Sequence, residues 1–223
     1  MIKAIVFDLD DTLISEYEYI QSGFTVVAKS LSEKYELLQH DVLFKLMDLF
    51  QESPKNVFNR ILDFYHIDYT VEDIKELIAI YRQHFPDISL YEDAKFILNE
   101  LSEKNLKIGM ITDGCQVTQR NKLVSLNIDS YFNSIIVTDE LGREFWKPHS
   151  RPYELIKEQL DVEFNEMIYI GDNVSKDFVT AKKLGIKTIH IKRDEGIYTG
   201  LKYAQEYEAH YQISSLEQVI NFI

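Results

Sequence analysis

Cysteine, proline and glycine are scarce in this chain of 223 residues, which contains 1 Cys, 4 Pro and 8 Gly. Because Cys115 is its only cysteine, the chain cannot form an internal disulfide, and a disulfide-rich secreted scaffold is excluded. The low content of glycine and proline also excludes collagen-like and low-complexity chains.

Long apolar runs are missing as well. No stretch approaches the roughly 18 apolar residues that a membrane-spanning helix needs. The first apolar run, residues 2–7, meets carboxylates too early for a signal peptide. We therefore expect a soluble, cytoplasmic protein that does not associate with a membrane.

Positive charge is in short supply. The chain has 24 Lys and Arg against 37 Asp and Glu, a formal net charge of −13. A protein that follows a nucleic-acid backbone or binds an anionic membrane needs a basic surface, so neither partner is expected. If the substrate is an anion, local positive groups have to overcome the field of the whole molecule.

The pattern that is present is an alternation of short strands and helices. Apolar residues make up 45% of the chain, which suits a globular protein of one or two domains. Short apolar runs predict strands, and the segments between them predict crossover helices, which gives a Rossmann-like, doubly wound, mostly parallel α/β sheet. The predicted strands are 2–7, 106–111, 133–137, 167–170 and 187–191, with an edge strand at 210–213; the predicted helices are 116–126, 153–160, 175–184 and 216–223.

Residues 16–86 differ from the rest because they contain no obvious strand. Their apolar residues recur at helical spacing, and Thr70 followed by acidic residues is typical of a capped helix start. We predict four or five helices inserted after the first strand. The domain prediction is a core of residues 1–15 and 87–223 with an all-helical cap of residues 16–86.

Two aspartates follow the first strand directly. Asp8 comes at the strand's end and Asp10 two residues later, where functional groups gather in open α/β sheets. Neighbouring carboxylates favour a hard cation such as Mg²⁺ and permit different roles for two acids in one site. The pair alone is equally compatible with a solvated acidic turn.

Other strand ends make the functional interpretation stronger. The second strand ends in Thr112-Asp113-Gly114, whose hydroxyl and turn amides can hold a phosphate oxygen. The fourth strand is followed by Asp172, which can complete a cation site with Asp8, and by Asp177. Lys147 precedes a proline in an intervening loop. Carboxylates, a hydroxyl and a lysine are together the groups that phosphoryl transfer requires.

These four motifs, in this order, resemble those of haloacid dehalogenase superfamily hydrolases, in the subgroup whose helical cap is inserted between the first and second motifs. The resemblance spans essentially the whole chain. It implies that Asp8 is the nucleophile and accepts the phosphoryl group as an aspartyl-phosphate. It implies that Asp10 is the general acid for the leaving group and then the base for water.

The resemblance also implies the binding roles. Thr112, Asp113, Gly114 and Lys147 would bind the substrate phosphoryl group, with Thr112 and Lys147 also acting in catalysis. Mg²⁺ would be bound by the carboxylates of Asp8 and Asp172 and by the backbone carbonyl of Asp10. Asp177 would orient Lys147 or a metal-bound water.

Two departures from the family pattern concern charge. Asp113 stands where many relatives have Asn, which adds a negative charge near the expected phosphate site. After Lys147-Pro148 the chain continues with His149-Ser150-Arg151 instead of the usual acid. A helix-start role on the surface is favoured for His149 and Arg151 over contact with an anionic substrate.

The predicted function is a Mg²⁺-dependent phosphatase acting on a small phosphorylated metabolite. A phosphomutase with the same motifs is an open alternative. A dehalogenase of the superfamily has a non-acidic residue two positions after its nucleophile, so Asp10 argues against it. A phospho-receiver signalling module has about half this length, which argues against that class.

Cys115 lies near Thr112 but has no histidine close in sequence, so a packed thiol is favoured over a nucleophile.

Overall fold

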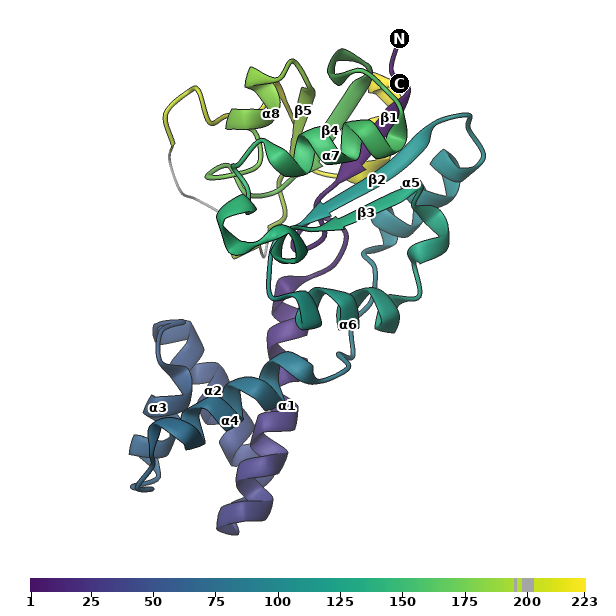
Figure 1. Cartoon of the computed structure of the whole chain (residues 1–223). Coiled ribbons are helices and arrows are strands. Elements are labelled where there is room, and N and C mark those ends of the chain that lie inside the picture. The colour runs from purple at the N-terminus through teal and green to yellow at the C-terminus, as the bar shows by residue number, and fades with distance from the viewer. Residues whose placement is uncertain (195, 198–202) are drawn as a thin grey trace. The chain divides into compact units, whose positions relative to one another are not determined.

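The computed structural model describes residues 1–194, 196–197 and 203–223 (Figure 1). The chain divides into two compact units, one of residues 1–17 and 88–223 and the other of residues 18–87. Among the described residues, no helix is both long enough and apolar enough to cross a membrane.

The first unit is built on a six-stranded parallel sheet with the order β3-β2-β1-β4-β5-β6. The strands are β1 (Ala4–Phe7), β2 (Lys107–Thr112), β3 (Ser134–Val137), β4 (Met167–Gly171), β5 (Lys187–Ile191) and β6 (Tyr211–Ile213). This sheet confirms the predicted α/β class and the edge strand. Because Phe7 is in register with both Met110 and Ile170, the carboxyl ends of β1, β2 and β4 lie at one level.

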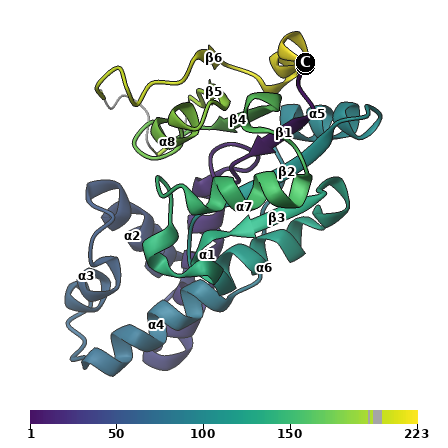
Figure 2. The same cartoon turned by 45° about the horizontal axis from the view of Figure 1, so that its top comes forward.

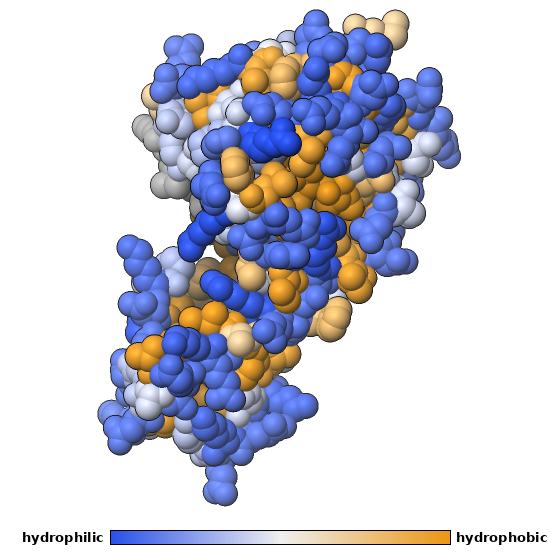
Figure 3. All heavy atoms as spheres, in the orientation of Figure 1, coloured by the Kyte–Doolittle hydropathy of each residue, from blue (hydrophilic) through white to orange (hydrophobic). Residues whose placement is uncertain are grey.

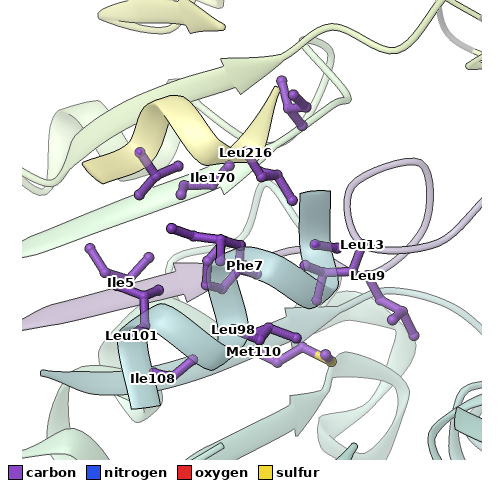
Figure 4. Packing of buried hydrophobic residues seen from close by; sticks show 14 of the residues in the cluster. Ile5, Phe7, Leu9, Leu13, Leu98, Leu101, Ile108, Met110, Ile170 and Leu216 are labelled. Atoms are coloured by element: carbon purple, nitrogen blue, oxygen red, sulfur yellow. The ribbon is translucent and has the colours of Figure 1, made fainter. Parts of the chain in front are cut away.

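Successive residues of the central strand serve two separate cores. Ile5 and Phe7 pack on one face with α5 (Glu92–Ser102), Leu123 of α6 (Gln116–Leu126) and the C-terminal 3₁₀ helix (Figure 4). Ala4 and Val6 pack on the other face with α7 (Arg151–Leu160) and α8 (Val179–Lys183). In Figure 2, α7 runs along β2 and β3. Alternate side chains of a strand point to opposite faces, so β1 is apolar throughout and covered on both sides.

The predicted C-terminal helix is present as a 3₁₀ helix, Leu216–Phe222, which Ser215 caps. One predicted helix is shorter than expected. The segment predicted as helix 175–184 is helical only in α8, because the backbone N–H groups of Lys176 and Asp177 both bond to the carbonyl of Asn173 and form a turn. This turn holds Asp177 beside the end of β4.

The second unit contains most of α1 (Glu16–Tyr35), with α2 (Gln39–Glu52), α3 (Val57–Phe64) and α4 (Val71–Gln83). The ring of Phe24 packs against Phe50, Phe58 and Tyr81. The expected helix start at Thr70 is a capping box with Asp73.

The visible surface in Figure 3 is mostly hydrophilic with apolar residues between the polar ones, as the high charge content leads one to expect.

Candidate active site

Asp8 continues the central strand by one residue. Its backbone N–H donates to the carbonyl of Ile170 at 2.8 Å. This bond ties the first residue of the following loop to β4. The loop then turns back on itself, with the N–H of Leu13 bonded to the carbonyl of Leu9. Asp11 has a φ of 49° in this turn, and its carboxylate accepts from the N–H groups of Glu16 and Ile197. The first motif is therefore held by its own backbone and by residues far along the chain.

Lys147 joins two of the aspartates. Its Nζ lies 2.9 Å from Oδ1 of Asp8 and 2.8 Å from Oδ1 of Asp177, and the lysine side chain is fully buried. It also donates to the hydroxyl of Tyr169. Burial alone would lower the pKa of Lys147, but the charges of Asp177 and Asp8 outweigh it and hold that pKa well above its ordinary value. The lysine is therefore a permanent positive charge beside Asp8.

Asp8, Asp172 and Asp177 form an acidic group whose carboxylate oxygens lie within 4.8 Å of one another. Desolvation raises the pKa of Asp8 to about 6, and it raises the pKa of Asp172 well above its ordinary value, helped by the charges of Asp177 and Asp8. Asp8 and Asp172 offer hard oxygen donors in a group whose charges are costly to bring together, and such donors suit a divalent cation such as Mg²⁺. The donor set therefore fits the expected metal.

Asp177 is already engaged on both of its oxygens. Oδ1 forms an ion pair with Nζ of Lys147 and accepts a hydrogen bond from the hydroxyl of Tyr169. Oδ2 accepts a hydrogen bond from the N–H of Asn173. Gly171 permits this approach, because a Cβ there would lie 2.4 Å from Oδ2 of Asp177. These contacts suit the predicted role of orienting Lys147.

Asp113, the acid of the second motif, has a neutralising partner. Its carboxylate accepts from the hydroxyl of Thr138, the backbone N–H of Lys147 and Nζ of Lys176, the last at 2.9 Å. Burial alone would raise the pKa of Asp113, but Lys147 and Lys176 outweigh it and lower that pKa. The extra negative charge thus ties three segments together, and Lys176 offsets it. Sequence reasoning missed Lys176, which stands one residue before Asp177.

Gly114 follows with a φ of 140°, a conformation that favours glycine. A Cβ at this position would also meet the side chain of Gln119 at 3.0 Å. The turn amides predicted to face a phosphate are therefore positioned by a residue type that has no ready substitute.

Two side chains of α6 contact the remaining predicted residues. Nζ of Lys122 lies 2.6 Å from Oδ1 of Asp10, while Nε2 of Gln119 donates to Oδ2 of Asp10 at 3.0 Å and to Oγ1 of Thr112 at 2.5 Å. Gln119 and Lys122 were missed as well. A signal was available: the first two turns of α6 contain a single large apolar residue, Val117, so the face toward the sheet has to be polar.

The side-chain contacts therefore divide the predicted site residues into two groups, and the members of each group contact one another. Lys147 links Asp8 and Asp177 and, through its N–H, Asp113; Asp172 joins them in the acidic group. Gln119 links Asp10 to Thr112.

His149 and Cys115 have local contacts. Nδ1 of His149 accepts from the N–H of Arg151, and its ring packs against Phe145. The carbonyl of Cys115 accepts from the N–H of Gln119 in the first turn of α6. The contacts of His149 suit the predicted helix-start role, and Cys115 is a half-buried free thiol.

A parallel sheet with an aspartate pair after its central strand, a buried lysine beside the first aspartate and a helical insert before β2 is the arrangement of a class of α/β hydrolases. A family model described as haloacid dehalogenase-like hydrolase matches residues 5–191, and the chain belongs to that family. The family membership confirms the resemblance drawn from the motifs and sets aside the receiver module.

Three relatives illustrate the match. The chain is 28% identical to a glyceraldehyde 3-phosphate phosphatase from Methanocaldococcus jannaschii, over all of this chain and 97% of the relative. It is 27% identical to the pyrophosphatase PpaX from Bacillus mycoides, over 98% of this chain and 95% of the relative. A crystal structure of a phosphatase of this family from Thermococcus onnurineus has the same fold, with a TM-score of 0.64 at 24% identity over 99% of this chain and 97% of that one.

Proposed function

We propose that this hydrolase is a Mg²⁺-dependent phosphatase that releases phosphate from a small phosphorylated metabolite through an aspartyl-phosphate on Asp8. The observation that carries the proposal is the position of Lys147, whose buried ammonium lies within 3 Å of both Asp8 and Asp177. An anionic nucleophile can approach an anionic phosphate only where fixed positive charge offsets their repulsion. The names of two relatives, which specify phosphorylated substrates, support the same reaction class.

In the first step, a carboxylate oxygen of Asp8 attacks phosphorus and the bond to the leaving oxygen breaks. Asp10 donates its proton to that oxygen. Lys147, the hydroxyl of Thr112 and the amides at Asp113 and Gly114 hold the transferring oxygens.

In the second step, Asp10 takes a proton from water, the water oxygen attacks phosphorus, and the bond to Asp8 breaks to release phosphate. Asp8 and Asp172, with the backbone carbonyl of Asp10, would hold Mg²⁺, which when bound neutralises charge on the phosphoryl group.

We further propose that residues 16–86 act as a cap that selects the leaving group. Support comes from the compactness of the unit formed by residues 18–87, whose helices pack around their own aromatic cluster. Residues 1–15 and 87–223 would then carry the chemistry alone.

The test is a screen of the purified protein for phosphate release. The panel contains phosphorylated sugars and acids, glyceraldehyde 3-phosphate, pyrophosphate and an aryl phosphate, each with Mg²⁺ and with a chelator. Release that requires Mg²⁺ and disappears in Asp8→Asn supports the proposal. Conversion of one sugar phosphate to another without phosphate release would indicate a phosphomutase. Halide release from a 2-haloacid that persists with the chelator would indicate a dehalogenase.

A further inference from the structure

The inner face of α6 is polar where the other large helices of the sheet are apolar. The buried residues of α5 are Ala94, Ile97, Leu98 and Leu101, whereas those of α6 are Thr118, Gln119, Lys122 and Leu123. Only 3% of the Lys122 side chain and 1% of Gln119 are exposed. Desolvating a lysine is costly, and a buried ion pair is often no more stabilising than apolar residues of the same volume. Stability of the fold therefore gives little reason for this choice of residues.

The two polar side chains meet one carboxylate from two sides. Lys122 contacts Oδ1 of Asp10 and Gln119 contacts Oδ2, so each oxygen has its own donor from α6. Asp10 keeps 18% of its side chain exposed, which leaves its oxygens able to reach a further partner. Two donors on a planar group fix both the place of the carboxylate and the orientation of its plane.

Gln119 also ties this arrangement to the second motif. Its amide donates to Thr112 as well as to Asp10, and a Cβ on Gly114 would touch it. The acid after β1 and the hydroxyl at the end of β2 are thus held at a set separation by one amide group.

We propose that Lys122 and Gln119 are positioning residues, which hold the Asp10 carboxylate where it exchanges a proton with the leaving oxygen and with water. The inference rests on the proposed function, because it assigns these residues a part in the same reaction. The geometry that supports this role is the pair of donors from α6, one on each oxygen of the Asp10 carboxylate. Proton transfer depends steeply on placement, since a displacement of about 1 Å can cost on the order of 100-fold in rate.

The first experiment is a double-mutant cycle on turnover of an alkyl phosphate. We expect Lys122→Met to lower kcat by roughly 10- to 100-fold, with KM little changed. In the Asp10→Asn background the same substitution should cost at most about twofold more, because a residue that acts through Asp10 has nothing left to position. An equally large further loss in that background would overturn the proposal and make Lys122 an independent substrate contact.

A leaving-group comparison separates positioning from general damage. An aryl phosphate needs little protonation of its leaving oxygen, so Lys122→Met and Gln119→Leu should slow it less than an alkyl phosphate. The matched control is Arg120→Met on the same helix, which removes a surface ion pair with Glu140. It should leave both turnover numbers unchanged. Equal losses on the two ester types in both α6 variants would contradict the proposal.

A crystal structure supplies a readout that does not depend on activity. In Lys122→Met or Gln119→Leu the Asp10 side chain should be displaced or adopt more than one conformation, whereas in Arg120→Met it should stay in place. If Lys122→Met does not fold, Gln119→Leu and the double variant Asp10→Asn/Lys122→Met, which removes both charges, carry the test. An unmoved Asp10 would overturn the positioning role.

Failure of the proposed function would give a different result: the wild type would release no phosphate, or Asp10→Asn would hydrolyse alkyl phosphates at full rate.

Discussion

Asp8 and Asp10 are separated by one residue, yet each is paired with its own lysine in a different charge environment. On the Asp8 side, the three carboxylates of Asp8, Asp172 and Asp177 share the ammonium of Lys147, which leaves an excess of negative charge. On the Asp10 side, each oxygen of one carboxylate has its own donor, an ammonium on Oδ1 and an amide on Oδ2, and the charge of Lys122 also acts on the carboxylates of Asp11 and Glu16. The first side, where carboxylates gather around one lysine, suits a divalent cation, and the second, where both oxygens of one carboxylate are held, suits a group that has to keep a fixed orientation.

The largest expected effect tests the Asp8 side. Asp8→Asn should reduce turnover on the order of 10⁴-fold or more, because an amide cannot form the acyl-phosphate. Phosphate release measured with Mg²⁺ on both alkyl and aryl phosphates checks this. Near-native turnover on either ester would place the nucleophile elsewhere.

The Asp10 side should respond in a way that depends on the substrate. Asp10→Asn removes proton transfer and keeps the backbone carbonyl, so turnover of an alkyl phosphate should fall by roughly 10²- to 10⁴-fold, and that of an activated aryl phosphate by less. Mg²⁺ binding, measured by calorimetry, should change little, whereas Asp172→Ala should weaken it strongly. A lost metal site in Asp10→Asn would make that side chain a direct ligand and blur the distinction between the two sides.

Lys147→Met should affect rate and stability together. The rate should fall by roughly 10²- to 10³-fold, as for a lost oxyanion donor. Two buried carboxylates would also lose their partner, which typically costs about 3–5 kcal/mol in the free energy of unfolding. Chemical denaturation measures the second effect, and Lys157→Met is the control because its partner Glu163 is largely exposed. If both variants unfold at the same denaturant concentration, the buried lysine is not holding the acidic group together.

The smallest expected effect is a dependence of metal binding on pH. The pKa of Asp8 is raised to about 6, and that of Asp172 is also raised, so protons bind to these carboxylates in mildly acidic solution. Below pH 6 the protonated form predominates on Asp8 and opposes Mg²⁺. The rise in Tm that Mg²⁺ produces should therefore be larger at pH 8 than at pH 5.5. A rise that is equal at the two pH values would show that these carboxylates do not titrate against the metal.

Most of the site residues that the sequence predicted lie at strand ends. The ends of β1, β2 and β4 are marked by abrupt changes from apolar residues to Asp8, Thr112 and Asp172, and parallel strands carry such residues to one edge. The same apolar runs predicted all six strands. Local pattern was enough because the strands are short apolar runs bounded by polar residues, buried throughout in β1 and β4 and reduced to a single buried residue, Ile213, in the edge strand β6.

The parts that were missed depend on partners distant in sequence. Gln119 and Lys122 lie on a helix whose bounds the sequence predicted correctly. The local sequence does not show, however, which residues of that helix face an aspartate more than a hundred positions earlier. Lys176 finds Asp113 across 63 positions in the same manner. The C-terminal helix was predicted without a helix type, and the structure shows it as 3₁₀, a distinction that depends on capping and packing more than on periodicity.

The central place of β1 has a consequence for how the molecule forms during synthesis. β1 ends at Phe7, but its two neighbours begin at Lys107 and Met167, so β1 has no strand partner until about a hundred further residues have been made. Residues 18–87 have their own contacts and can assemble in the meantime. The apolar side chains of Ile5 and Phe7 stay uncovered during that interval, which is the condition under which nascent chains recruit chaperones. Asp8, which follows β1 directly, is thus enclosed between its neighbouring strand ends only after β2 and β4 have been made.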